Sequence, residues 1–175
     1  AVPTPLPAAG AEAAAVLHDG LALWSGDAYA EFDDEDWAQP EATRLSEIWL
    51  VAHESLFDAE LACGRAAEVI PMIEPVACAH PLREGLHSQL MVALYRAGRQ
   101  ADALRVYRDY RERLLEDLGL DPTPALTELE RRILAHDPTL LLTEHSGRRL
   151  RGYRLGERLG TGRVGTVYAA HLPGV

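Results

Sequence analysis

The feature that most constrains the fold is a Gly-Arg turn that occurs twice, 34 residues apart, at Gly64 and at Gly98. A spacing of 34 residues is the period of a tetratricopeptide helix pair. Apolar residues recur at matched distances from the two glycines: Phe57 and Met91 before them, Val69 and Ala103 five residues after, Ile73 and Tyr107 nine residues after. The centre of the chain is therefore predicted to form stacked helical hairpins, which offer a surface for binding rather than a site for chemistry.

Apolar residues at a 3.6-residue spacing predict helices over residues 11–24, 40–63, 66–79 and 100–118, with further helices after Pro81 and after Pro124. The inward face of the second helix is predicted to hold Leu45, Ile48, Trp49, Ala52 and Leu56. The inward face of the helix over 100–118 is predicted to hold Leu104, Tyr107, Leu114 and Leu118. Pro71 and Pro75 each remove a backbone donor, so a kink or a late start is expected in the helix over 66–79.

Charge is distributed unevenly, with −12 over residues 1–64, −3 over residues 65–147 and +5 over residues 148–175. Nucleic acid would repel the strongly acidic residues 1–64, so we expect this part of the chain not to contact DNA. All seventeen basic residues are arginine, so the chain offers no lysine for a Schiff base or for phosphate binding. No apolar run approaches the roughly 20 residues of a membrane span. With Cys63 and Cys78 outside any metal-ligand spacing, a reduced cytoplasmic protein is the simplest account, and a disulfide is the alternative.

Several conspicuous side chains are better explained by structure than by ligand binding. Trp24, Trp37 and Trp49 are predicted to pack and to hold a loop on the core. The histidines have no metal-ligand spacing, so no metal site is expected. On the helix over 100–118, charges alternate in sign and predict an exposed ion-pair face, which serves solubility or a partner protein. This face holds Arg105, Arg108, Asp109, Arg111, Glu112, Arg113 and Glu116.

One motif near the end of the chain has a chemical meaning, Gly-x-Gly-x-x-Gly-x-Val at Gly160, Gly162, Gly165 and Val167. The residues after the last glycine favour a strand, so a β-hairpin is expected rather than the strand-to-helix turn of a dinucleotide fold. Such a hairpin resembles the glycine-rich loop that covers the phosphates of ATP in protein kinases. Neither a phosphate-pairing lysine nor a catalytic aspartate follows before Val175, so we expect no cofactor and no phosphoryl transfer in this fragment. ATP is expected only in a full-length protein.

Six stretches point to a known family: residues 21–26 (Leu-Ala-Leu-Trp-Ser-Gly), 37–38, 80–84, 90–100, 103–107 and 118–124. In this order they resemble the bacterial transcriptional activator domain of the antibiotic regulatory protein family of actinobacteria. The resemblance implies a tetratricopeptide-like domain beside a DNA-binding winged helix, with roles in self-association and activation and with no catalytic residues. The winged helix is expected to be missing here, since Ala1 begins in the linker region. Pro75 departs from the family pattern.

The expected fold is all-α, with tetratricopeptide-like stacked hairpins and a short C-terminal β-hairpin from a truncated second domain. We expect a linker over 1–10, the activator domain over 11–138, a linker over 139–152 and a kinase-like hairpin over 153–175. The expected function is a regulatory, non-enzymatic domain of a multidomain transcriptional regulator. Its expected partners are a second copy, RNA polymerase and, only through the missing winged helix, promoter DNA; no membrane is expected. Two alternatives stay open: a helical extension of a serine/threonine kinase, and a repeat scaffold unrelated to transcription.

Overall fold

The computed structural model describes residues 7–32, 34–141, 149–150, 153–162 and 165–171, and residues 7–141 of this part are all-helical. The α-helices are α1 (Pro7–Ala22), α2 (Gln39–Ala62), α3 (Ala66–Ala79), α4 (Glu84–Arg96), α5 (Gln100–Leu118) and α6 (Pro124–Leu134). Two 3₁₀ turns, η1 (Ala30–Phe32) and η2 (Pro138–Leu141), lie between α1 and α2 and after α6. The all-helical prediction is confirmed for this part, and α1 begins at Pro7, inside the stretch expected to be a linker. No described helix is long and apolar enough to cross a membrane.

The backbone after residue 148 forms an antiparallel sheet in the order β1–β2–β3. Its strands are β1 (Arg149–Leu150), β2 (Tyr153–Gly162) and β3 (Gly165–His171). That this sheet begins a kinase-like domain stays a prediction.

The two Gly-Arg turns have the same geometry. Gly64 and Gly98 have φ angles of 81° and 78°, in the left-handed region that a residue without a Cβ adopts at little cost. In each turn the N–H of the next arginine donates to a carbonyl oxygen five residues earlier, at 3.1 Å after Gly64 and 2.8 Å after Gly98. These bonds satisfy carbonyls that the helix end leaves without a partner. The predicted repeat is therefore present in the backbone itself.

The side chains around the two turns follow the same repeat. All six apolar positions that match between the copies are buried, five of them completely: Phe57 and Met91, Val69 and Ala103, Ile73 and Tyr107. Each pair occupies one place in a hairpin, so the same packing contact is made twice along the stack. The prediction from the spacing is confirmed at every one of these positions.

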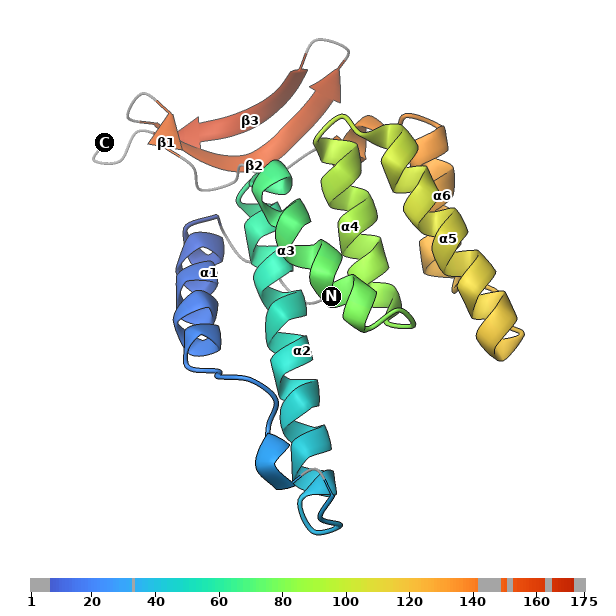
Figure 1. Cartoon of the computed structure of the whole chain (residues 1–175). Helices are drawn as coiled ribbons and strands as arrows, with labels where there is room; N and C mark the ends of the chain where they lie inside the picture. Colours follow the sequence, from blue (N-terminus) through green and yellow to red (C-terminus); the bar gives the residue numbers. More distant parts are fainter. Residues whose placement is uncertain (1–6, 33, 142–148, 151–152, 163–164, 172–175) are drawn as a thin grey trace.

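The helices stack in chain order, and each contacts its neighbours along the sequence (Figure 1). α4 lies between α3 and α5, while α2 and α6 contact α4 from either side, as the first helices of successive units do in a helical repeat. α6 thus occupies the place of the first helix of a third unit. In the described part of the chain, no α-helix follows it to complete that unit.

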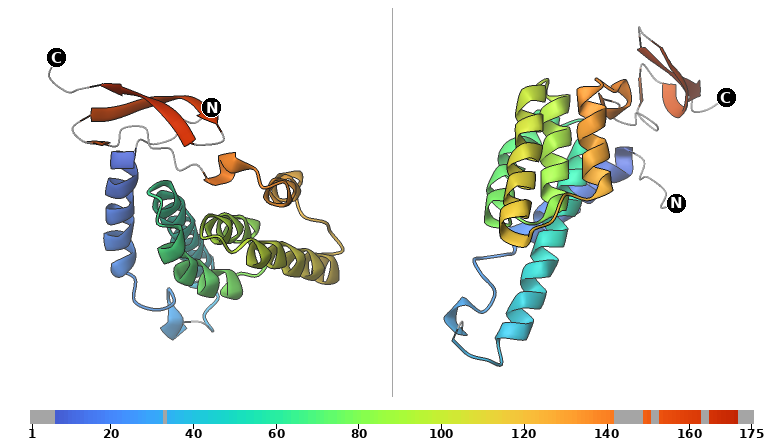
Figure 2. Two further views of the ribbon diagram at one scale, coloured as in Figure 1. Left: turned by 90° about the horizontal axis from the view of Figure 1, so that it is seen from above. Right: turned by 90° about the vertical axis from the view of Figure 1, so that its right-hand side faces the viewer.

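The first half of α2 extends beyond the ends of α3 and α4, as Figure 1 and the right-hand view of Figure 2 both show. In this half Ile48 is exposed, although the spacing predicted it to face the core, whereas Leu50 is buried. The prediction for Ile48 is wrong because no other helix covers that side of α2. Farther along, where α2 is packed, Leu56 is buried as predicted.

α3 runs from Ala66 to Ala79 through both prolines, so of the two expected outcomes, a kink or a late start, the late start does not occur. Pro71 and Pro75 are four residues apart and exposed, which places them together on the solvent side of the helix. A proline costs an isolated helix roughly 3 kcal/mol. Burial of the opposite face offsets that cost, because each fully buried large aliphatic side chain contributes about 1.5–3 kcal/mol. The buried residues of α3 are Ala66, Val69, Ile70, Ile73, Val76 and Ala77.

The three tryptophans do not share one role. Trp24 and Trp49 are half-buried, and the ring of Trp49 lies against that of His53, with centroids 3.9 Å apart and ring planes 45° apart. Trp37 is 61% exposed, so the prediction that it packs into the core is wrong. Its exposure has a local cause, since it lies at the end of the α1–α2 connection, beside the projecting half of α2.

Candidate functional site

The candidate site is the groove between α5 and α6, and its two walls are anchored at both ends. At one end, the hydroxyl of Thr123 accepts from the N–H of Leu126 and so caps α6, and Pro124 follows as the first helical residue. The N–H of Thr123 also donates to the carboxylate of Glu84 at 3.0 Å, which ties the start of α6 to the start of α4. At the other end, the side-chain amide of Gln100 donates to the carbonyl of Ile133 at 2.9 Å.

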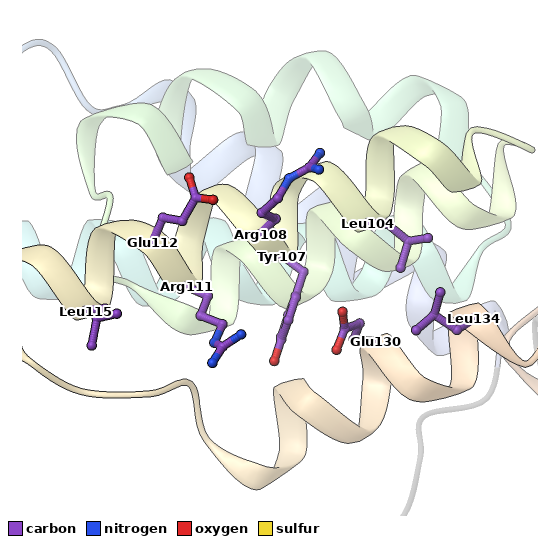
Figure 3. A pocket seen from close by; sticks show the side chains of 8 residues that line it. All are labelled: Leu104, Tyr107, Arg108, Arg111, Glu112, Leu115, Glu130 and Leu134. Carbon is purple, nitrogen blue, oxygen red and sulfur yellow. The ribbon is translucent and has the colours of Figure 1, made fainter.

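The groove has a volume of about 490 Å³ and is drawn in Figure 3. Its floor is Tyr107, whose ring points toward α6 and whose hydroxyl lies 3.3 Å from that of Thr127. The lining combines leucines with charges of both signs: Leu104, Leu115, Leu134, Arg108, Arg111, Glu112 and Glu130. Leu115 and Leu134 are 54% and 55% exposed. Exposed leucines in a concave surface with fixed charges suit contact with another protein chain.

The charged face of α5 is exposed as predicted, but its ion pairs differ from those expected. Arg105 pairs with Asp102 on the same helix, and Arg111 pairs with Asp121 in the turn that leads to α6, at 3.2 Å. Leu118, predicted to face inward, is also exposed, because α5 extends past the end of α4 there. The pairing of Arg111 and the exposure of Leu118 could not be read from this one helix, since they depend on the turn to α6 and on where α4 begins.

A second hollow, of about 270 Å³, lies between α3, α4 and α5 and contains Cys78, His87 and Tyr110. The Nε2–H of His87 donates to the carbonyl of Pro81 at 3.0 Å, and its ring lies 4.5 Å from that of Tyr110. Burial lowers the pKa of His87, so the ring is neutral at pH 7. Within the described structure, no hydrogen bond links Cys78 to this imidazole. His87 thus holds α4 to the preceding turn and does not activate a thiol.

The described strands bring the four residues of the glycine motif together. Gly160 pairs with Val167, and Gly162 pairs with Gly165, at the closed end of the β2–β3 hairpin. Arg163 and Val164, between them, lie outside the described residues. A role for these four residues in nucleotide binding stays a prediction. Within the described residues, no three metal-ligating side chains gather at one place.

Residues 6–134 match the family model of the bacterial transcriptional activator domain. The chain belongs to this family.

Relatives of this bacterial transcriptional activator domain are transcriptional regulators. The regulatory protein AfsR of Streptomyces griseus is 45% identical over 129 residues, or 74% of this chain and 13% of AfsR. The transcriptional regulatory protein EmbR of Mycobacterium bovis is 42% identical over 122 residues, or 70% of this chain and 31% of EmbR. The transcriptional regulator RedD of Streptomyces coelicolor is 39% identical over 135 residues, or 77% of this chain and 39% of RedD. The chain thus spans less than half the length of each.

The activator-domain fold is also found in a solved structure. Mycobacterium tuberculosis EmbR, in complex with a low-affinity phosphopeptide, matches with a TM-score of 0.72 and 41% sequence identity. The match covers 75% of this chain and 35% of that chain. The predicted resemblance to an activator domain is confirmed, and with it the assignment to a regulatory domain.

Proposed function

We propose that this chain is the regulatory and protein-interaction domain of a multidomain transcriptional regulator, and that it supports self-association and contact with RNA polymerase. The proposal rests on the α5–α6 groove, which leaves apolar side chains exposed at the end of the helical stack. The ends of helical repeats ordinarily present a polar outer face, because an apolar end promotes association. Leu115, Leu118 and Leu134 give this end the opposite character.

The charges of the groove favour a second copy of the chain as its first partner. Arg108 and Arg111 lie on α5, and Glu112 and Glu130 complete the lining, so the fixed charges balance. In a two-fold symmetric contact, each surface meets itself, and an arginine of one copy can face a glutamate of the other. A surface of one sign would be repelled in such a contact, whereas this one is complementary to itself.

Promoter DNA would be contacted through a separate winged helix rather than through these residues. Residues 1–64 hold thirteen acidic residues and one basic residue, Arg44. Arg44 is already engaged by the carboxylate of Glu41 at 2.9 and 2.6 Å. This part of the surface therefore offers no free cation for a phosphate backbone.

The test is the oligomeric state of the double variant Leu115→Asp/Leu134→Asp, measured by analytical ultracentrifugation over a concentration series. Burial of two leucines contributes about 3 kcal/mol or more, so the variant is expected to self-associate roughly a hundredfold more weakly than the unmodified chain. The matched control is Leu82→Asp, which places the same charge at an exposed leucine in the turn before α4. The control is expected to associate normally.

A monomeric wild-type chain at concentrations of about 100 μM would contradict self-association through this surface. Equal weakening by Leu82→Asp would instead show that charge in general, and not the groove, controls association. A reversal pair adds a second check: Arg111→Glu and Glu130→Arg are each expected to weaken association, and their combination is expected to restore part of it.

A second role is proposed for a longer protein that contains this chain. The antiparallel pairing of Gly160 with Val167 supports a kinase-like glycine-rich hairpin. In a complete domain, Gly160, Gly162 and Gly165 would let the backbone approach the phosphates of ATP. Since the chain contains no lysine, a phosphate-pairing lysine would have to come from elsewhere in that protein.

A further inference from the structure

The connection between α1 and α2 carries three exposed aromatic rings close together. Trp37 is 61% exposed, Phe32 43% and Tyr29 39%. The ring of Trp37 lies 5.3 Å from that of Phe32 and 6.0 Å from that of Tyr29, centroid to centroid. Residues 27–32 and 34–37, here called the aromatic–acidic loop, thus expose more aromatic surface than a loop needs to fold.

The backbone of the loop holds these rings in place. The N–H of Phe32 donates to the carbonyl of Tyr29 at 2.8 Å, and that of Glu35 donates to the carbonyl of Phe32 at 3.0 Å. The N–H of Ala38, which is itself buried, donates to the carbonyl of Glu35 at 2.9 Å. These successive turns order the loop, so little conformational entropy remains to be lost when a partner binds.

Exposed carboxylates alternate with the rings along the loop. The exposed acids of the loop are Asp27, Glu31, Asp34, Glu35 and Asp36. None of these five has an ion-pair partner among the described residues. The nearest base along the chain, Arg44, is held by Glu41. Aromatic faces beside free carboxylates attract cations, and arginine stacks on tryptophan especially well.

A hollow of about 430 Å³ adjoins the loop and gives it an apolar neighbour. Trp24 and Trp49 line it, together with Asp27 from the loop and His80 from the end of α3. An extended segment that stacks a cation on Trp37 can place an apolar side chain in this hollow. The two features together therefore select for a mixture of basic and apolar residues.

We propose that the aromatic–acidic loop and the adjoining hollow bind a segment of a partner protein in which arginine or lysine alternates with apolar residues. This surface lies by α1 and the start of α2, at the other end of the helical stack from the α5–α6 groove (Figure 1). It therefore provides a contact beyond self-association through the groove. Nucleic acid is excluded as the occupant because the free carboxylates repel phosphate.

The test uses a fluorescein-labelled peptide that alternates arginine with leucine, and fluorescence anisotropy on the 175-residue chain. A peptide with glutamate in place of arginine is the probe control. Binding of the arginine peptide is expected to weaken as salt rises from about 50 to about 300 mM, because the attraction is screened. The glutamate peptide is expected not to bind.

Two variants locate the binding surface. Trp37→Ala is expected to weaken binding about fivefold, and Asp34→Asn/Glu35→Gln/Asp36→Asn about tenfold with a smaller dependence on salt. Two controls remove the same groups elsewhere. Leu141→Ala truncates an exposed apolar side chain of η2, and Glu68→Gln/Glu116→Gln/Asp117→Asn removes three exposed carboxylates from α3 and α5. Circular dichroism checks that each variant is folded.

Three results would overturn the proposal. One is the absence of binding by the arginine peptide at low salt. Another is an equal loss of affinity in the control variants, which would mean that the peptide does not recognise the loop and responds to net charge alone. The third is concentration-dependent self-association that Trp37→Ala abolishes, since the occupant of the loop would then be a second copy of the chain.

Discussion

A pair of glycine-to-alanine changes tests whether the turn at Gly98 depends on its backbone conformation. An added Cβ would meet no atom within 4 Å at Gly98 or at Gly20, so steric clash is excluded at both positions. The two differ in φ, which is +78° at Gly98, whereas Gly20 lies inside α1 without a positive φ. We expect Gly98→Ala to destabilise the chain by about 1–2 kcal/mol, the cost of a Cβ in the left-handed region.

Gly20→Ala is expected to have the opposite sign. Alanine restricts the unfolded chain and favours the helix, so the variant gains about 0.5–1 kcal/mol. The two variants then differ by about 2 kcal/mol, roughly a thirtyfold change in the ratio of folded to unfolded chains. Urea unfolding followed by far-ultraviolet circular dichroism measures both. Gly98→Asn is a useful intermediate, since asparagine tolerates the left-handed region better than alanine does.

The reasoning is refuted if Gly98→Ala unfolds at the same urea concentration as the unmodified chain. It is also refuted if the two alanine variants shift together, because the change would then reflect composition and not conformation. A large loss in Gly20→Ala would show that α1 approaches another segment there more closely than the structure indicates.

Two further predictions concern side chains that join helices. The pKa of Glu60 is held below its ordinary value of 4.5, chiefly by a hydrogen bond from Arg65 and also by His18. The ionised carboxylate therefore stabilises the folded state above about pH 4.5, and this contribution is lost as the pH falls. Urea unfolding at a series of pH values is expected to show that the free energy of unfolding decreases less between about pH 6 and pH 3 in Glu60→Gln than in the unmodified chain. The exposed Glu116→Gln is the control. An equal decrease in Glu60→Gln and in the unmodified chain would contradict the prediction. Thr123→Ala is expected to lose about 1 kcal/mol of folding stability because the cap of α6 is missing, and Thr123→Ser is expected to keep most of that stability. Equal unfolding curves for the two variants and the unmodified chain would show that the cap is not needed.

The features that could be predicted from the sequence are those fixed by the conformation of a single residue. Gly64 and Gly98 end their helices because only glycine takes their backbone angles readily, and the apolar residues at fixed distances from them must face the same neighbours. The matched burial of Phe57 and Met91 follows from that repeat. The family could be inferred for the same reason, since its characteristic stretches lie in and around these hairpins.

The errors have a common physical origin, which is the part of each helix that its neighbours leave uncovered. Ile48 lies on a side of α2 that no described helix covers, and Leu118 is the last residue of α5, which is longer than α4. The α5–α6 groove could not be predicted for a related reason, because it exists only where the stack ends. Trp37 belongs to this group as well, since a tryptophan in a sequence gives no sign of whether another helix will cover it.

Glu60 shows that comparison of the two repeats does not predict every buried residue. Its counterpart 34 residues later is Leu94, and both are buried, although one carries a charge and the other is apolar. Arg65 pairs with the carboxylate of Glu60, and α1 brings His18 to within 3.3 Å of it. Such a contact joins residues 42 positions apart, so a repeat-based comparison could not supply it.

The incomplete third unit has a consequence for how the groove works. In a stack held by nearest-neighbour contacts, a helix at the end has neighbours on one side only and opens more readily than the helices inside. α6 is such a helix, and it supplies one wall of the groove. Opening of α6 would therefore remove the surface proposed to bind a partner, and an occupied groove would hold the helix closed. In that proposal, association and the local folding of α6 are linked equilibria, so the affinity for a partner would depend on the stability of α6.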